Sequence, residues 1–299
     1  MIVFMKEDKM MTNGIRKIHV FFLLFSIMAV AGLLSVTGCG APQFKSPLFQ
    51  HSDYSTWGPN AMTWNGRDLV LAERDMIMDI NFIETEDYLR PDKVDEREGY
   101  YRFGRDPMAI ATIANLNIGG LAWEGESAKR GYLWVLDTNS RQLYKLNTNY
   151  EVLLQLPAPG ESPRGLAYDG VNLWTTDVKD SKIYKVSPAD GSILAEFNSP
   201  IKTPSGLAWD CSGLWIIGMD TCKQVASTCY ASKLVRFDID NGRVALDAAL
   251  PWQVTRPTAI AWVDGILWVA DSNLNRVFQL PATGRPSQDG TVYLSAVKK

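Results

Sequence analysis

One phrase recurs along this chain and constrains its fold more than any other feature. Its form is Pro-x-Gly-Leu-Ala-Trp, a short turn, Leu-Trp-Val and then Asp. The Leu, Ile or Met of the phrase falls at positions 62, 121, 166, 207 and 260, so the intervals are 59, 45, 41 and 53 residues. Such a period indicates a structural unit that is built several times over. The copies run over Pro59–Glu73, Gly119–Asp137, Pro163–Asp177, Pro204–Asp220 and Pro257–Asp271.

A second phrase follows each copy and alternates polar and apolar residues. Gln142–Leu146 and Lys182–Val186 are examples, and this alternation predicts a half-buried strand. A turn such as Ala189-Asp190-Gly191 leads into a further apolar run, here Ser192–Phe197. Each unit is therefore predicted to hold four short strands joined by turns of Gly, Asp and Asn. Four-stranded units at this period are typical of a β-propeller.

The repeat predicts an all-β chain whose propeller domain spans residues 59–299. Five copies favour five blades. Pro107–Ala111 resembles another opening phrase but lacks the turn and the Leu-Trp, so we interpret it as the last strand of the first blade. A sixth blade is the alternative. Residues 41–58 and Gly290–Leu294 are candidates for strands that close the ring.

Tryptophan recurs at two positions of the phrase, and we expect these rings to pack between the blades. The first position precedes the turn and the second follows it. The residues are Trp64, Trp123, Trp209 and Trp262 at the first, and Trp134, Trp174, Trp215 and Trp268 at the second.

The N-terminus has the order of parts expected of an export signal. Four basic residues precede an uncharged stretch from Val20 to Leu34, which is shorter than a spanning helix requires. The sequence then reads Ser35-Val36-Thr37-Gly38-Cys39, which resembles the lipobox of bacterial lipoproteins. This resemblance implies a signal peptide over 1–38, acylation of Cys39 as a membrane anchor, and a tether over 39–58. Gly40 after the Cys favours the outer membrane if the host is Gram-negative.

Charge and histidine content exclude several classes of function. The chain carries 30 basic and 33 acidic residues, and residues 1–38 hold four and two of these, so 26 and 31 remain after cleavage. A net negative domain gives no footprint for nucleic acid. The two histidines are His19, inside the signal peptide, and His51, outside every repeat. Mechanisms that need a pair of histidines are therefore disfavoured.

Three cysteines remain after lipidation. A strand over Leu214–Met219 would hold Cys211 and Cys222 too far apart for a disulfide. We therefore predict a bond between Cys222 and Cys229 within an enlarged loop, Met219–Ser232, and a free thiol at Cys211.

The loops that enter the first strand and those that join the second to the third share one face of a propeller, where we place the candidate ligand site. It is predicted to be a polar ring that binds a polar ligand or a divalent cation such as calcium. The simpler interpretation is that each Asp closes its own turn. The residues are Asn60, Arg164, Ser205, Arg256 and Thr258 from the first loops, and Asp137, Asn139, Asp177, Asp220, Asp271 and Asn273 from the second.

The phrase resembles a broad group of propellers that includes NHL-repeat proteins, streptogramin lyases, gluconolactonase-like hydrolases and glutamine cyclotransferases. The resemblance to gluconolactonases implies a metal held near Asp177 or Asp271 and Asn60. However, Pro-Arg-Gly and Pro-Ser-Gly stand where that family has Pro-Asn-Gly, and its first-blade Glu is absent. The Ser-Thr-Gly stretch of the cyclotransferases is also absent.

Two functions follow from these observations. The first is a tethered binding or scaffold module for an envelope protein, peptide or glycan. Its contact elements would be the disulfide-closed loop and the acidic insert Glu84–Glu98. The second is a propeller enzyme of the lactonase or cyclotransferase type. No GxSxG, Walker, GxGxxG, HExxH or CxxC motif is present to support a particular chemistry, and this favours the binding module.

Overall fold

Five antiparallel sheets make up the part of the chain that the computed structural model describes, residues 58–81, 108–222, 229–250, 254–263, 265–274 and 276–281. All of them belong to the compact unit Gly38–Lys299. The nineteen strands in this part are accompanied by no helix, so it holds none that could cross a membrane. The predicted signal peptide, Cys39, the tether and the acidic insert lie outside the described residues.

Each sheet is one blade, and its strands follow one another in sequence order. Blade 1 is β1 (Ala61–Trp64), β2 (Asp68–Glu73), β3 (Met76–Asn81) and β4 (Met108–Thr112); blade 2 is β5 (Ile118–Ser127), β6 (Arg130–Asp137), β7 (Gln142–Leu146) and β8 (Val152–Pro157). Blade 3 is β9 (Pro163–Tyr168), β10 (Leu173–Asp177), β11 (Lys182–Val186) and β12 (Ile193–Asn198). Blade 4 is β13 (Thr203–Trp209), β14 (Leu214–Cys222), β15 (Cys229–Asp238) and β16 (Arg243–Ala249); blade 5 is β17 (Pro257–Val263), β18 (Ile266–Asp271) and β19 (Arg276–Pro281).

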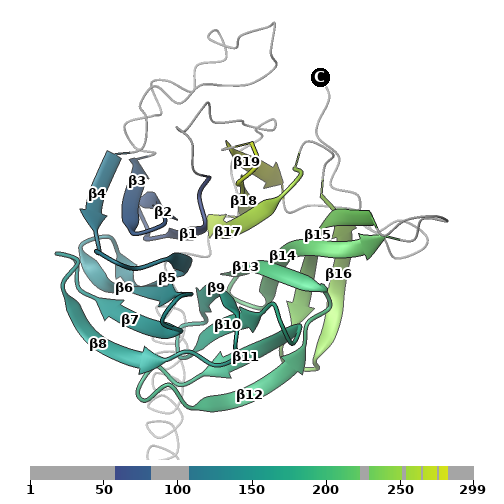
Figure 1. Cartoon of the computed structure of the whole chain (residues 1–299), viewed down its shortest axis with the longest axis horizontal. Coiled ribbons are helices and arrows are strands. Elements are labelled where there is room, and N and C mark those ends of the chain that lie inside the picture. Colours follow the sequence, from purple (N-terminus) through teal and green to yellow (C-terminus); the bar gives the residue numbers. More distant parts are fainter. Residues whose placement is uncertain are drawn as a thin grey trace, which may run out of the picture. The chain divides into compact units, whose positions relative to one another are not determined.

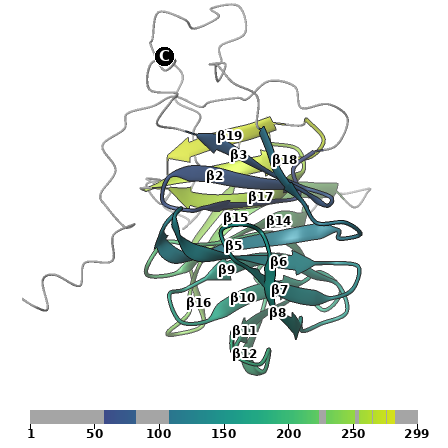
Figure 2. The same ribbon diagram turned by 90° about the vertical axis from the view of Figure 1, so that its left-hand side faces the viewer.

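The first strand of every blade lies innermost, and these five strands surround the axis (Figure 1). Each contacts the first strand of the next blade, and β17 contacts β1, which closes the ring. Figure 2 shows the same arrangement from the side, with β5 to β8 toward the viewer. The five-bladed propeller predicted from the repeat is therefore confirmed, as is the assignment of Pro107–Ala111 to blade 1 through the pairing of β4 with β3. The six-blade alternative is wrong. The proposed closing strands, 41–58 and Gly290–Leu294, lie almost entirely outside the described residues.

Apolar side chains fill the space between adjacent blades in five clusters, one for each pair of neighbours. The second strand of a blade is covered on both faces, and β10 and β18 are buried along their whole length. The outermost strands are much more exposed, as in β8 and β12. The expected packing of tryptophan is confirmed, because Trp134, Trp174, Trp215 and Trp268 each belong to a different inter-blade cluster.

Small residues let the five inner strands approach one another closely. A Cβ on Gly120 would lie 2.8 Å from the backbone of Gly165, and one on Gly206 would lie 3.1 Å from the Cα of Ala259. The Gly of the repeated phrase is therefore required by close packing around the axis. The space left in the channel is a cavity of only about 10 Å³, which is roughly the room one water molecule needs. The channel is closed, and the two faces of the propeller are separate.

The cysteine region differs from expectation in two ways. The segment predicted as a loop over Met219–Ser232 is largely an extended hairpin, in which Met219 pairs with Ser232 and Cys222 with Cys229. Cys211 forms a disulfide, so the free thiol is wrong. The sequence argument excluded only Cys222 as its partner and assumed the remaining pairing. The other cysteines of the chain are Cys39, Cys222 and Cys229, so a disulfide of Cys211 within the chain occupies one of these three. Acylation of Cys39 and a Cys222–Cys229 bond, as predicted from the sequence, therefore cannot both hold.

Candidate functional site: a cationic pocket on the loop face

A pocket of about 500 Å³ opens over the closed channel on the face formed by the loops between blades and by the turns between second and third strands. All five blades contribute to it. Three columns of the repeat supply the lining besides Pro204 and Pro257. The first column precedes the Pro, or Ile118 in its place, and gives Gly58, Asn117, Thr203 and Arg256; the second follows the Pro and gives Asn60, Arg164, Ser205 and Thr258. The third follows Glu73, Asp177, Gly218 and Asp271 on the second strands and gives Arg74, Val178, Met219 and Ser272.

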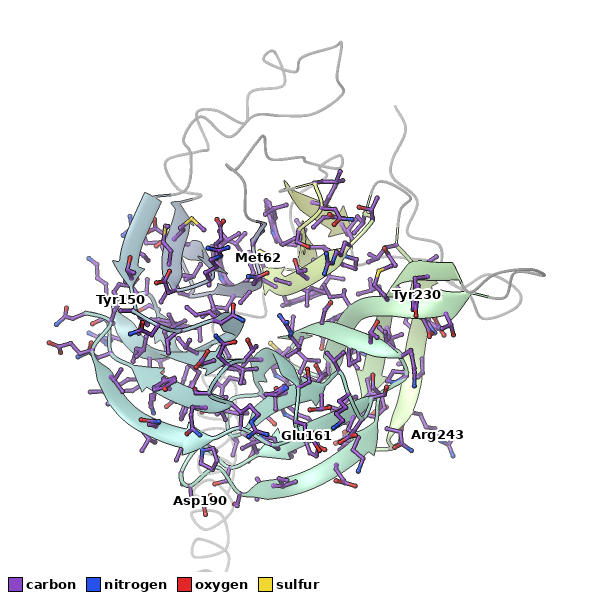
Figure 3. All side chains as sticks on the ribbon, viewed as in Figure 1. Met62, Tyr150, Glu161, Asp190, Tyr230 and Arg243 are labelled. Carbon is purple, nitrogen blue, oxygen red and sulfur yellow. The ribbon has the colours of Figure 1, made fainter. Side chains whose placement is uncertain are left out.

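Register shifts mark the second of these columns. In blades 4 and 5, Ser205 and Thr258 are skipped in the pairing of the first strand with the second. Blade 3 has a shift beside Arg164, and blade 2 skips Gly119. Such bulges commonly redirect a side chain at a functional rim. The column that follows the Pro therefore meets at the pocket. Met62, two positions beyond Asn60 in the phrase, lies near the centre of the ring (Figure 3).

Three hydroxyl groups of the pocket, those of Thr203, Ser205 and Thr258, are hydrogen-bonded to the backbone. Ser205 Oγ donates to the Pro257 carbonyl at 2.7 Å, and Thr258 Oγ1 donates to the Pro59 carbonyl at 2.6 Å. Both bonds join neighbouring blades, and the second lies at the closure of the ring. Thr203 Oγ1 donates to the Met219 carbonyl at 2.6 Å. Because these protons are engaged, the hydroxyl oxygens present lone pairs to the pocket.

The recurrent Asp closes loops and does not line the pocket. Asp177 accepts from the backbone N–H groups of Ser162 and Asp180, and Asp271 accepts from those of Thr255, Arg256, Asn273 and Leu274. Asp137 accepts from the N–H groups of Asn117, Asn139 and Ser140 and from the Ser140 hydroxyl. Burial alone would raise the pKa of Asp137, but these hydrogen bonds lower it. The turn-closing interpretation is confirmed for these three residues.

Asp220 is not the equivalent of these residues, although the sequence phrase ends with it. The register places Gly218 opposite Pro204, just as Asp177 stands opposite Pro163. Asp220 lies two residues farther along the extended hairpin, where Lys233 Nζ is 3.0 Å from its carboxylate. The longer hairpin of blade 4 thus removes the loop-closing carboxylate and brings Met219 to the pocket instead.

The structure gathers only part of the predicted ring. Asn60, Arg164, Ser205, Arg256 and Thr258 meet in the pocket. Asn139 accepts a hydrogen bond from the Asn117 side chain at its edge, and the Asn273 N–H contributes to the turn of Asp271. Sequence reasoning missed Arg74, Asn117, Thr203 and Ser272, which alignment of the column before the phrase and of the column after the second strand could have revealed.

The metal candidates do not come together. Asn60 lines the pocket, whereas Asp177 and Asp271 bind their own loops in different blades. Among the described residues, no group of three His, Cys, Asp or Glu side chains is placed to hold a metal ion. The donor set of the pocket in these residues consists of amide, hydroxyl and guanidinium groups.

Three arginines, Arg74, Arg164 and Arg256, line the pocket and make it cationic. Within the described ranges, the guanidinium groups of Arg164 and Arg256 donate no hydrogen bond and form no ion pair, whereas Lys145, Lys233 and Arg236 all contact carboxylates. Burial lowers the pKa of Arg164, and the positive charge of Arg256 lowers it further. Two cations therefore repel each other in one polar pocket.

The opposite face has a different pattern of charge. In blades 2, 3 and 4 an acid near the first turn accepts the indole N–H of the buried Trp and faces a cation on the third strand. The sets are Glu124 with Trp134 and Lys145, Asp169 with Trp174 and Lys185, and Asp210 with Trp215 and Arg236. β3 ends on this face, since Asn81 stands opposite Asp68, and β4 begins there, since Met108 stands opposite Asp79. The predicted contact element Glu84–Glu98, which falls between these two strands in the sequence, lies outside the described residues.

Comparisons with known proteins support the fold. No protein-family model matches the sequence, and no curated protein matches it. Among solved structures, the glutaminyl cyclase of Myxococcus xanthus is similar, with a TM-score of 0.53 and 12% identity over 78% of this chain and 97% of that one. A nidogen/laminin complex gives a TM-score of 0.48 and 16% identity over 75% of this chain and 76% of the other. At these identities the likeness concerns the propeller alone.

Proposed function

We propose that this chain is a lipid-anchored, extracytoplasmic β-propeller that acts as a binding module for an envelope protein, peptide or glycan. The observation that carries the proposal is the pocket itself. Side chains of all five blades converge on one face, above a channel that is closed by packing. In the described part of the lining there is no carboxylate, imidazole or thiol to serve as a general base or nucleophile. This composition suits binding better than covalent or acid–base chemistry.

The membrane anchor rests on the sequence. A basic segment, an uncharged apolar stretch and small residues before Cys39 stand in the order of a lipoprotein signal. Acyl chains on Cys39 would hold the domain at a bilayer, in the outer membrane of a Gram-negative host. Such a tether would leave the propeller able to meet partners at that surface. Labelling growing cells with a fatty-acid probe and comparing wild type with Cys39→Ala tests the anchor.

Capture of a partner tests the binding role. The full lipidated chain would be crosslinked in native membranes, and the captured material compared between Arg256→Glu and Arg243→Glu. Arg256 lines the pocket, whereas Arg243 begins the outer strand β16 and lies at the edge of the ring (Figure 3). We expect the same partner with wild type and Arg243→Glu, and about tenfold less with Arg256→Glu, a loss of about 1.4 kcal/mol in binding. Equal capture by both variants would contradict the proposal.

The alternative is a propeller hydrolase or cyclotransferase. The similarity in fold to a glutaminyl cyclase motivates one direct assay, the release of ammonia from peptides with N-terminal glutamine, alongside a lactone-hydrolysis assay. Calcium would be included in both, because a divalent cation is the cofactor this alternative implies. Turnover by wild type that Arg256→Glu reduces and Arg243→Glu leaves unchanged would replace the binding module with an enzyme.

A further inference from the structure

The strongest unexplained feature is a pair of arginines for which the described part of the chain supplies no acidic partner. Arg164 and Arg256 come from neighbouring columns of the repeat in blades 3 and 5, and both line the same pocket. Arg164 is half-buried and Arg256 is exposed. Elsewhere on the described surface, a cation in a comparable half-buried position is neutralised, as Arg236 is by Asp210 at 2.6 Å. Leaving a half-buried guanidinium unpaired costs free energy, and a ligand of opposite charge recovers it.

The side chain of Arg164 lies beside the inner strand of blade 2. Gly119 stands where the other blades carry Asn60, Ser205 or Thr258. A Cβ built on Gly119 would clash with Thr138 Cγ2 at 2.3 Å and would make ordinary van der Waals contact with Cδ and Nη1 of Arg164 at 3.6 Å. The side chain of Arg164 therefore extends from blade 3 to the backbone of blade 2. Packing on a neighbouring blade limits the freedom of this side chain before any ligand arrives, which favours tight recognition.

We propose that this pocket binds an oxyanion, a carboxylate or phosphate group, between the guanidinium groups of Arg164 and Arg256. The inference rests on the proposed function and names the chemistry of its ligand. Guanidinium groups present several donors in a fixed plane and match the oxygens of carboxylates and phosphates. An anion between the two guanidinium groups offsets the repulsion by Arg256, which together with burial lowers the pKa of Arg164, and supplies the counter-charge that the buried group lacks.

The rest of the lining adds a second requirement. The hydroxyls of Thr203, Ser205 and Thr258 donate to backbone carbonyls, so they can only accept from a ligand. The ligand should therefore carry hydroxyl or amide donors in addition to its anionic group. A cavity of about 500 Å³ suits a ligand of the size of a sugar acid, a sugar phosphate or a short acidic peptide end.

Three sugars of similar size provide matched probes. Glucuronate carries a carboxylate, glucose 6-phosphate carries a phosphate, and glucose carries neither. Binding of each to the full chain in detergent micelles would be measured by isothermal titration calorimetry. We expect at least one charged probe to bind at least about tenfold more tightly than glucose. Preference for glucuronate identifies a carboxylate ligand, and preference for glucose 6-phosphate identifies a phosphate ligand. If neither charged probe binds more tightly than glucose, the proposal is overturned.

Variants locate the site. Arg256→Gln and Arg164→Gln should each weaken the preferred probe about tenfold, whereas Arg243→Gln should leave it unchanged. Because Arg256 is exposed, its variant remains informative if Arg164→Gln fails to fold. Unchanged binding in Arg256→Gln would overturn the proposal. If the wild type captures its partner but no charged probe binds, the binding module is retained and the oxyanion ligand is rejected. If a charged probe binds but Arg256→Glu captures as much partner as the wild type, the oxyanion ligand is retained and the binding module is rejected.

Discussion

The two faces of this propeller treat charge in opposite ways. On the face of the first turns, three acids accept the indole N–H of a buried Trp and contact a Lys or Arg of the same blade. On the pocket face, the loop-closing carboxylates bind backbone N–H groups, and Arg164 and Arg256 have no acidic partner in the described part of the chain. The half-buried cations named on the first face are thus neutralised within their own blades, whereas the half-buried Arg164 of the pocket face is not. A half-buried charge without a partner points to a function at that face.

Removing one of the three acids from the face of the first turns should have the largest effect on stability. Asp210→Ala removes the acceptor of the Trp215 indole at 2.8 Å and the ion pair with Arg236, and it leaves two turn N–H groups unpaired. We expect the free energy of unfolding to fall by about 3 kcal/mol. Urea unfolding of the full chain in micelles measures it. The control is Asp190→Ala, an exposed turn residue near the rim, and a loss no greater than in this control would contradict the comparison.

Removing a loop-closing carboxylate from the pocket face should have the second-largest effect on stability. Asp177→Ala leaves the N–H groups of Ser162 and Asp180 without their acceptor in a buried position, which should cost about 2 kcal/mol. Asp220→Ala is the matched control, because Asp220 occupies the hairpin and closes no such loop; we expect a loss of about 0.5 kcal/mol. Stabilisation of wild type by calcium that Asp177→Ala abolishes would instead identify this carboxylate as a metal ligand.

Acid titration should separate the two kinds of carboxylate. Burial would raise the pKa of Asp210, but the hydrogen bond and charge of Arg236 lower it below its usual value. Its contribution to stability is thus present above the unfolded-state pKa of about 3.9 and is lost as the pH falls through the lower folded-state pKa.

The measurement is the stability gap between wild type and Asp210→Asn as the pH is lowered. The gap should close at acid pH and should narrow in about 1 M salt, where the screening length is about 3 Å. For Asp137→Asn the gap should also close in acid but respond less to salt, because hydrogen bonds with uncharged groups lower that pKa. Equal salt responses would contradict the distinction between the faces.

The smallest effect should have the opposite sign. Arg256→Gln removes a charge that repels Arg164, so in the absence of anions it should raise the free energy of unfolding by about 0.3 kcal/mol. Arg243→Gln, at the rim, provides the control, and denaturant unfolding at low salt measures both. A loss of stability in Arg256→Gln would mean that an acidic group of the protein pairs with this arginine, and that the two faces do not differ in how their charges are neutralised.

The sequence predicted the blades, but only five of the fourteen residues that line the pocket. The period of the phrase and the alternation after it predicted five blades, because strand-forming patterns and turn residues act over a few neighbouring positions. The same pattern misled at Asp220, where a longer hairpin shifts the register by two residues. It also could not distinguish a carboxylate that closes a loop from one that faces a ligand, since Asp suits both roles.

By itself the sequence determined the repeating unit, its inner strand and the small residue that lets five such strands meet at the axis, as Gly120, Gly165 and Gly206 do. Only the tertiary structure decided which residues share the pocket and which charges are neutralised. Arg164 and Arg256 are 92 positions apart in the chain and meet in one pocket because β9 contacts β13 and β13 contacts β17 around the axis. Local sequence patterns specify the strands, but the arrangement of the blades around the axis specifies which of their side chains meet in the pocket.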